Sequence, residues 1–400
     1  MKRMIIGILC MVSLATWAGE TKEVKNGMAP QGKAITYKLT EDLVIGPQDD
    51  LEGTIWAGFD TSVDVDAQGN MYVCDPAGAR IIKFDASGTL VKTIGQRGQG
   101  PGEFQALKSL TVLNDGSLLA FENAQVISNQ NFFSNDGAFL DKKVHQSMEN
   151  IVSQALFGPS GDLAMAVVSN VDMAQKKIHN KFALVNAAYE PKDVIIEFES
   201  PLPDPSQFQS SEYWANYLGG NMRKTSKGLV GFAAFGDDGT VYTARMNTYE
   251  VTKYNKDLTP ELKFTRAFKP IPMTENEMKA VVEPIQEMVA SQLPPQLQQI
   301  ITPQTIKKAV EIAEFPAIKN PVAGLKYSSL GHILVIHDAN METKIAKVDI
   351  FSTQGVYLGS FEHDTFGVMR MTIKNDHVYT IEERDEENHL VRYKVEVVKQ

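Results

Sequence analysis

The stretch Gly95-Gln-Arg-Gly-Gln-Gly-Pro-Gly-Glu-Phe104 holds four glycines within eight residues, with one arginine among them. Glycine-rich loops can bind phosphate, but such a loop is followed by a helix and ends in a Lys-Ser or Lys-Thr pair. This stretch ends in Glu-Phe and precedes a strand-like run, and Pro101 removes one backbone N–H donor that a phosphate loop would use. We therefore interpret it as a crossover between two sheets, in which the glycines allow left-handed turns and Phe104 fills the gap between the sheets.

A pattern of strand, tight turn and strand occurs six times along the chain. The second strand of each pair is nearly all apolar, which is typical of a strand buried on both faces. The turn residues are Gly69, Gly116, Gly161, Gly239, Gly331 and Asp376. The first unit continues with strand-like runs at Arg80–Asp85 and Leu90–Gly95, and the fifth unit continues in the same way. Four antiparallel strands that recur at about 45 residues predict the blades of a β-propeller.

The last unit has three clear strands, the third of which is His389–Val398. The missing fourth strand is available at Tyr37–Gly46, near the other end of the chain. An N-terminal strand that completes the final blade would close the ring and remove most of its exposed edges. The sequence therefore predicts an all-β fold, a six-bladed β-propeller over residues 35–400 that is closed by its N-terminal strand.

Three runs in the first unit together resemble a known repeat, the NHL repeat. They are Gly69–Asp75, Ala79–Phe84 and Ile94–Phe104. Asp75 and Arg80 match the usual Asp and Arg of this repeat, whereas the second unit departs from it at Glu122–Val126. The chain is also similar to secreted bacterial six-bladed propellers built from such repeats. The resemblance implies a fold and leaves the chemistry open.

Two gaps between units are too long for a simple crossover. Residues 200–228 are rich in Pro and Ser and are expected to form a loop that carries Tyr213 and Trp214. Residues 270–321 are expected to form a helical hairpin, because Thr274–Glu277 is a capping box that precedes an apolar stripe at helical spacing. Both insertions join a fourth strand to the next first strand, so we expect them side by side on one rim beside the central channel.

The N-terminus predicts export. Residues 1–18 combine Lys2 and Arg3 with an apolar run and a small residue at Ala18, which is the pattern of a secretory signal peptide, and residues 19–34 are expected to be flexible. Cleavage would take the formal charge from −10 to −12, a balance that disfavours nucleic acid as a partner. It would also leave Cys74 as the single cysteine and no membrane span in the mature chain. The expected destination is the periplasm or the extracellular space.

Residues at the ends of second strands, at the starts of third strands and on the insertions are expected to ring the face that bears the insertions. The candidate binding residues are Asp75, Arg80, Asn123, Tyr213, Trp214, Arg245, Arg370 and Glu382. Arg370, early in a first strand, is expected to face the channel. The alternative is that these are solvated loop residues and ion pairs that lock the blades, with the aromatic residues anchoring their insertion.

Candidates for catalysis are few. His337-Asp338 is the best acid–base pair that the sequence offers, with Glu122 as a third candidate, and His363-Asp364 is a second pair expected on the opposite rim. No zinc, redox or hydrolase motif is present, so no cofactor or metal site is predicted. A channel Ca²⁺ or other divalent metal held by scattered carboxylates remains the alternative.

Two functions follow from these observations. The first is an exported non-enzymatic propeller that binds a protein, a peptide or a carbohydrate (glycan) on its insertion-bearing face. The alternative is a metal-dependent hydrolase or lyase that uses a site in the central channel.

Overall fold

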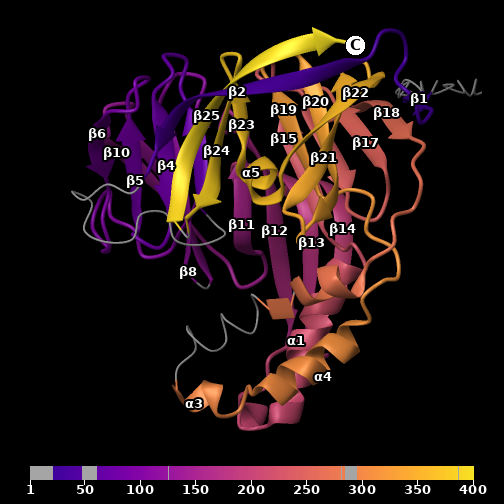
Figure 1. Cartoon of the computed structure of the whole chain (residues 1–400). Helices are drawn as coiled ribbons and strands as arrows, with labels where there is room; N and C mark the ends of the chain where they lie inside the picture. The colour runs from indigo at the N-terminus through magenta and orange to yellow at the C-terminus, as the bar shows by residue number, and fades with distance from the viewer. Residues whose placement is uncertain (1–20, 47–60, 125, 281, 284–294, 386) are drawn as a thin grey trace, which may run out of the picture.

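The computed structural model describes residues 21–46, 61–124, 126–280, 282–283, 295–385 and 387–400. The expected signal peptide at residues 1–18 lies outside these ranges. The described chain is mostly β-strand with few helices, and its sheets stand side by side in a propeller-like arrangement (Figure 1). None of the described helices has the length and apolar character that crossing a membrane requires.

Four antiparallel sheets follow one another along the chain, and in each of them four consecutive strands lie in chain order. The first contains β3 (Ser62–Val65), β4 (Met71–Asp75), β5 (Arg80–Phe84) and β6 (Leu90–Ile94). The second contains β7 (Leu107–Val112), β8 (Leu118–Ala124), β9 (Ile127–Phe133) and β10 (Phe139–Gln146). The third contains β11 (Ile151–Phe157), β12 (Leu163–Asp172), β13 (Lys177–Asn186) and β14 (Pro191–Pro201). The fourth contains β15 (Gly231–Phe235), β16 (Val241–Arg245), β17 (Glu250–Tyr254) and β18 (Pro260–Arg266).

Eight further strands form one closed ring. One run contains β19 (Gly324–Ser328), β20 (His332–Asn340), β21 (Ile345–Ser352) and β22 (Tyr357–Asp364). The other contains β23 (Thr372–Lys374), β24 (His377–Arg384), β25 (Glu387–Lys399) and β2 (Ile35–Ile45). Each run is continuously antiparallel, but a single parallel residue pair joins them at either side, Ser328 with Ile373 and Ile35 with Gly359.

The expected pairing of the two chain ends is present. β2 pairs antiparallel with β25 at ten positions, from Ile35 opposite Lys399 to Ile45 opposite Leu390. A buried cluster that includes Val63, Tyr379 and Leu390 then packs the ring against the first sheet. The chain ends are therefore joined by both backbone pairing and apolar packing.

The six expected turns share one backbone conformation. Each lies between the first and second strands of its unit, and its turn residue has φ between 55° and 84°. These residues are Gly69, Gly116, Gly161, Gly239, Gly331 and Asp376. Because a left-handed φ favours glycine, this repeated geometry explains the repeated Gly in the sequence.

The stretch 95–104 joins β6 to β7 and is a crossover, as predicted. Phe104 is fully buried between the first and second sheets, with its ring centroid 5.8 Å from that of Phe133. Gly95 has a φ of 76°, and a Cβ on it would lie 2.3 Å from the Phe104 ring. The glycine at this position is required by both the turn and the close packing.

The insertions are more helical than the sequence suggested. Within the described residues the insertions contain α1 (Ser211–Ser226), α3 (Pro295–Gln298) and α4 (Pro303–Ala313), with a 3-10 turn η2 (Pro205–Gln207) and helical residues at 275–280 and 282–283. A further short helix, α5 (Thr365–Arg370), lies outside the insertions, between β22 and β23. Most of the insertion at 200–228, expected to be a loop, is therefore the 16-residue helix α1. α1 packs on α4 at Gly219, where a Cβ would approach the Ala309 carbonyl oxygen to 2.6 Å, so the absence of a side chain allows the contact.

Two further expectations need correction. The first strand in which Arg370 was expected begins only at Thr372, and Arg370 instead ends α5, which Asp364 caps by accepting a hydrogen bond from Gly367 N at 2.7 Å. The N-terminal segment expected to be flexible contains β1 (Lys22–Asn26), which pairs parallel with β18. Both differences arise where short polar residues favour a cap or a bridge that hydrophobic periodicity does not reveal.

Asn26 joins β1 to two neighbouring elements. Its side-chain amide donates to the carbonyl oxygens of Thr265 and Gly355, each at 2.9 Å, and its Oδ1 accepts from Tyr357 N at 2.8 Å. Since the residue is 5% exposed, its loss would leave buried backbone groups unpaired.

We expect Asn26→Ala to lower the free energy of unfolding by about 2 kcal/mol, since buried groups that lose their partners cost about 1–3 kcal/mol. Urea denaturation monitored by circular dichroism measures this change. Lys25→Ala, which removes a side chain that is 81% exposed, is the matched control. Equal unfolding midpoints for the two variants would contradict the assigned role of Asn26.

Candidate functional site

The first strands of all the units converge on one cavity, which we call the inner cavity. It has a volume of about 220 Å³, and it is lined by residues of β3, β7, β11, β15, β19 and β23. Its lining includes Asp64, Thr111, Leu156, Phe235, Lys326 and Lys374, one from each of these strands. The cavity therefore lies at the centre of the sheets.

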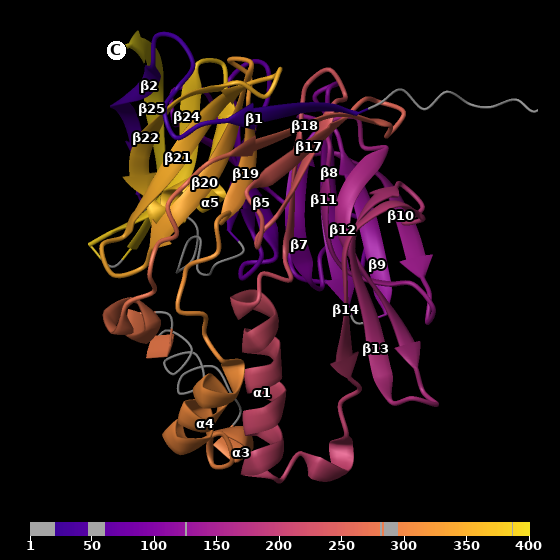
Figure 2. The same ribbon diagram turned by 90° about the vertical axis from the view of Figure 1, so that its right-hand side faces the viewer.

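A second cavity, the mouth cavity, adjoins the inner one. It has a volume of about 660 Å³ and includes Lys108, Asn123, Gln154, Gly324 and Met369 in its lining. These residues lie toward the ends of the units at which the crossovers enter, so the mouth cavity faces the insertion-bearing rim. Figure 2 shows α1 and α4 on that rim. The two cavities share lining residues, namely Ser62, Leu156, Ala233, Leu325 and Lys326. Together they form what we call the central channel.

Lys326 lies at the junction of the two cavities. Burial lowers the pKa of its amine to about 8, and the negative charge of Asp64 offsets only part of this effect. Among the residues that the structure describes, Lys326 has no hydrogen-bond or ion-pair partner, and Asp64 acts on it only through its charge. Its shared neighbours Leu156, Ala233 and Leu325 are apolar. The channel thus holds an ammonium group that has no direct counter-ion within the described ranges.

Asp64 is fixed in place by the backbone around it. Its carboxylate accepts hydrogen bonds from Val65 N at 2.8 Å and from Val112 N at 2.7 Å, and Lys374 Nζ lies 3.8 Å from it. Burial raises the pKa of the Asp64 carboxyl, and Lys374 and the two backbone donors oppose that rise. Lys374 also donates to the Val65 carbonyl oxygen at 3.0 Å. These two charges therefore hold β3, β7 and β23 together.

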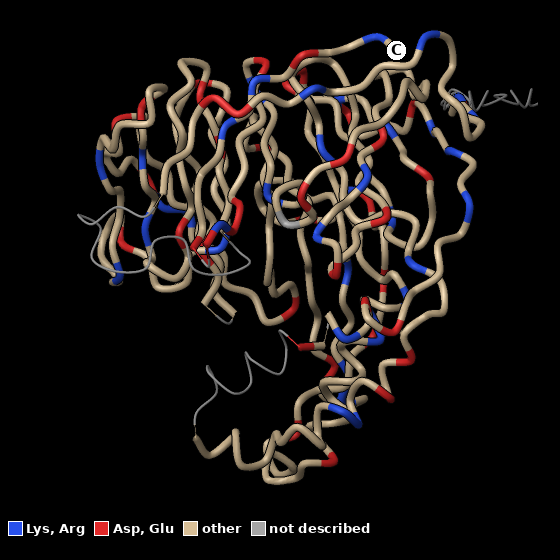
Figure 3. Tube along the Cα trace, viewed as in Figure 1, with Lys and Arg blue, Asp and Glu red and all other residues tan. Residues whose placement is uncertain are grey.

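The channel lining carries more positive than negative side chains. The basic residues are Lys108, Lys326, Arg370 and Lys374, and the acidic residues are Asp64 and Asp237. This excess contrasts with the formal charge of −10 of the whole chain, whose acidic and basic residues are intermingled along the trace (Figure 3). Within the described ranges, no group of three or more His, Cys, Asp or Glu that could bind a metal ion is found.

Most candidates near the first two sheets stabilise the scaffold. Asp75 is fully buried and binds Arg80 at 2.9 Å, closing the turn between β4 and β5. Glu122 is also fully buried and accepts hydrogen bonds from Gln105 N and Asn131 Nδ2, each at 3.2 Å. Asn123 donates to the Val152 carbonyl oxygen at 2.7 Å and reaches the mouth cavity.

The expected acid–base pair His337-Asp338 does not form. His337 Nε2 lies 3.2 Å from Asp349 Oδ1, whereas Asp338 binds Lys319 at 2.9 Å and Lys347 at 3.1 Å. Neighbouring strand residues point to opposite faces, and the register of β20 is irregular at this point. Asp349 also accepts from Tyr249 and Arg266, so His337 belongs to a buried polar network between the fourth sheet and the ring.

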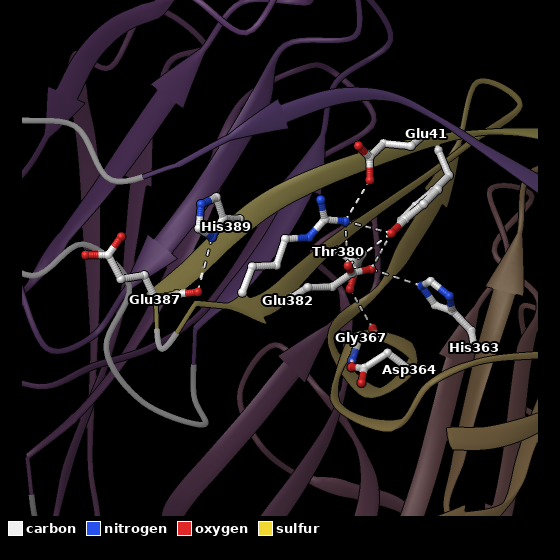
Figure 4. Close-up of polar contacts among 10 residues, drawn as sticks. Glu41, His363, Asp364, Gly367, Thr380, Glu382, Glu387 and His389 are labelled. Atoms are coloured by element: carbon white, nitrogen blue, oxygen red, sulfur yellow. Dashed lines mark hydrogen bonds and ion pairs between the residues drawn. The ribbon is translucent and has the colours of Figure 1, made fainter. Parts of the chain in front are cut away.

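His363 and Asp364 also bind different partners. Asp364 caps α5, whereas His363 Nε2 lies 3.2 Å from Glu382 Oε1 (Figure 4). The expectation that this pair lies on the rim opposite the insertions is wrong, because His363, near the end of β22, contacts Glu382, which was expected on the insertion-bearing face. Glu382 further accepts from Arg384 at 2.9 Å and from Tyr393 at 3.0 Å. Burial acts to raise the pKa of Glu382, but the hydrogen bonds from His363, Arg384 and Tyr393 outweigh it and lower that pKa.

The remaining candidates divide between anchoring and the channel. Trp214 donates from Nε1 to the Phe208 carbonyl oxygen at 2.8 Å and packs on the cluster of Ile301 and Ile306. Tyr213 accepts from Asp204 N at 2.9 Å through its hydroxyl. These contacts anchor the insertion. Arg245 is an exposed residue at the end of β16, and Arg370, at the end of α5, lines the inner cavity.

The sequence reasoning missed Asp64 and Lys326, although a signal for them existed. Both are charged residues inside short strands that are otherwise largely apolar, Ser62–Val65 and Gly324–Ser328. Both strands are the first of their units, which are the innermost strands of a propeller.

Comparisons with known proteins support the fold alone. No protein family and no curated protein matches the sequence. A member of the DUF4221 family from Bacteroides vulgatus has a similar structure, with a TM-score of 0.52 and 11% identity over 92% of this chain and 100% of that chain. Also similar is a PQQ-bound aldose sugar dehydrogenase from Streptomyces coelicolor, with a TM-score of 0.42 and 10% identity over 92% of this chain and 100% of that chain. A candidate exported protein from Bacteroides fragilis has a TM-score of 0.47 and 11% identity, over 94% and 100% of the two chains.

The pKa of Lys326 predicts how Lys326→Met changes stability with pH. The folded-state value of about 8 lies below the ordinary value of 10.5, so the unfolded chain binds more protons between these pH values. The free energy of unfolding of the wild-type protein then rises by up to about 1.4 kcal/mol for each unit that the pH increases within this window. Below pH 8 the folded protein carries the full cost of desolvating the charged amine. We expect Lys326→Met to be more stable than wild type at pH 7, with a gap that narrows toward pH 10.

Urea unfolding of both proteins at pH 7 and pH 9.5 measures this gap. The buried tyrosines titrate in both proteins, so their contribution cancels in the difference. A gap that is the same at both pH values would show that the Lys326 amine is not desolvated in the folded protein.

Proposed function

We propose that the chain is an exported six-bladed β-propeller that binds a small carboxylate-bearing ligand, such as an organic acid or the acidic end of a peptide or glycan, in its central channel. The blade count treats the eight-stranded ring as two blades. Within each run of four strands the antiparallel backbone pairing is continuous, whereas the two runs are joined to each other by a single residue pair at each side. The resemblance to the NHL repeat in the first unit supports this count, and the sequence of residues 1–18 supports export.

The observation that carries the proposal is the ammonium of Lys326, which has no hydrogen-bond or ion-pair partner in the described part of the chain. With a pKa of about 8, the amine is protonated at pH 7 although it is largely desolvated in the half-buried lining of the channel. A buried charge without a direct counter-ion is costly, and a bound anion would compensate it. Carboxylates bind such an ammonium through charge-assisted hydrogen bonds.

The surroundings of Lys326 favour entry of the anion from the insertion-bearing rim. The mouth cavity on that side is the larger of the two, and Lys108 lines it. Arg370 lines the inner cavity beyond the junction. On the opposite rim Asp237 lines the inner cavity, and its charge would repel an anion arriving from there.

The alternative function, a metal-dependent hydrolase or lyase, draws no support from the channel. Its candidate residues His337, Asp338 and Glu122 do not line either cavity. Each of them is engaged by neighbouring side chains or backbone. We therefore propose binding rather than catalysis.

Isothermal titration with butanoate and with its neutral amide, butanamide, tests the proposal at pH 7. We expect the wild-type protein to prefer the carboxylate. Lys326→Met should weaken butanoate binding roughly 10- to 100-fold, the factor expected for a lost hydrogen bond to a charged group. Affinity for butanoate should also fall above pH 8 as the amine loses its proton.

The matched control is Lys38→Met, because the Lys38 side chain is 66% exposed and its nearest charge is Glu396 at 3.8 Å. This variant should bind butanoate like wild type. Equal affinity of the wild-type protein for butanoate and butanamide, or unchanged butanoate binding by Lys326→Met, would overturn the proposal.

A further inference from the structure

A third cavity lies between the helical insertions and the rim of the sheets, and we call it the methionine pocket. It has a volume of about 310 Å³. Its lining is Met222, Thr225, Ser226, Met246, Met273, Phe315, Pro316, Lys319, Asn320, Val322, Ala323 and Ala339. Three thioethers and a phenyl ring make this lining largely apolar. Unbranched methionine side chains adapt their shape to an apolar guest, so the pocket suits a flexible hydrocarbon group.

The walls of the pocket are held by backbone hydrogen bonds. Val322 N donates to the Met246 carbonyl oxygen at 3.2 Å, which ties the segment before β19 to the end of β16. Met273 N donates to the Ala317 carbonyl oxygen at 3.0 Å, which ties the two arms of the second insertion together. The pocket is therefore built by the fold from five separate parts of the chain, namely residues 222–226, 246, 273, 315–323 and 339.

The charge in the lining is already neutralised. Lys319 is the charged residue of the pocket, and its ammonium binds Asp338 at 2.9 Å and also binds Glu277. These two carboxylates hold the pKa of Lys319 above its ordinary value, against the opposing effect of burial. An anion in the channel would therefore find its free partner at Lys326 rather than here.

The methionine pocket adjoins the central channel. Ala323 lines both the pocket and the mouth cavity, and Lys326 follows it by three residues on the same extended segment. Three residues of extended chain span about 10 Å. A single elongated molecule can therefore place one end beside Lys326 and the other among the methionines.

We infer that the ligand of the central channel is an amphiphilic carboxylate, with its anionic head at Lys326 and its hydrocarbon chain in the pocket formed by Met222, Met246 and Met273. This inference rests on the proposed function, because it uses the same anion site. It adds the chemical class of the ligand, a medium-chain monocarboxylic acid.

The chain-length dependence of binding tests the inference on the wild-type protein. Isothermal titration with butanoate, hexanoate, octanoate and decanoate at pH 7 should show a Kd that falls about four-fold for each added methylene, the factor that corresponds to ~0.8 kcal/mol per buried CH₂. If Kd stays constant from butanoate to decanoate while butanoate binding still needs Lys326, the inference fails and the proposed function stands. If butanoate binding does not need Lys326, both fail.

A pair of variants locates the chain. Met222→Gln combined with Met246→Gln keeps the side-chain length but makes the pocket polar, so the gain from hexanoate to decanoate should largely disappear while butanoate binds as before. Met173→Gln, at a side chain that is 72% exposed, should retain the wild-type series. A series that the double variant leaves unchanged would overturn the assignment of the methionine pocket.

Discussion

The pairing of β2 with β25 is the constraint on which the rest of the structure depends. Each sheet packs mainly on its neighbours through apolar clusters, so a circular arrangement needs one joint between the first and last parts of the chain. That joint is formed by residues that are far apart in sequence. Arg392 Nε, for example, donates a hydrogen bond of 2.9 Å to Asp42 Oδ1, which lies 350 positions earlier in the chain. Closing so long a loop costs conformational entropy, and contacts within the single sheets do not offset that cost. Ten backbone pairs and the buried cluster around Leu390 supply the compensation.

Closure brings the innermost strands together and so creates the channel. Side chains on these strands face one another across the axis, which explains why Asp64, Lys326 and Lys374 line the same cavity although they are far apart in sequence. Asp64 and Lys374 lie 3.8 Å apart and take up backbone hydrogen bonds, whereas Lys326 has no such partner among the described residues. Local rules are most often broken at functional sites. The amine that Asp64 compensates only in part is therefore the feature on which the proposed ligand site rests.

The sequence predicts the repeated architecture well because turn chemistry and strand alternation are local. Gly69 and its counterparts need a left-handed φ wherever they occur, so the turns can be recognised one by one. The site could not be predicted in the same way, because it depends on which residues line the channel and on which side chains form ion pairs with each other. His337 turns to Asp349 rather than to its neighbour Asp338, and no sequence pattern contains that choice. The helix α1 escaped recognition because Gly219 lowers helix propensity, yet Gly219 is what lets α1 approach α4.

The two insertions connect the scaffold to the channel. α1 and α4 pack on each other and stand on the same rim as the mouth cavity (Figure 2). One attachment of the second insertion to the sheets runs through Lys319, whose ammonium binds both Glu277 of the same insertion and Asp338 of β20. Because Lys319 also lines the methionine pocket, this attachment forms part of the wall of that pocket. The pocket takes its lining from α1, at Met222 and Thr225, and from the second insertion, at Met273 and Phe315, so a ligand that fills it would contact both insertions at once.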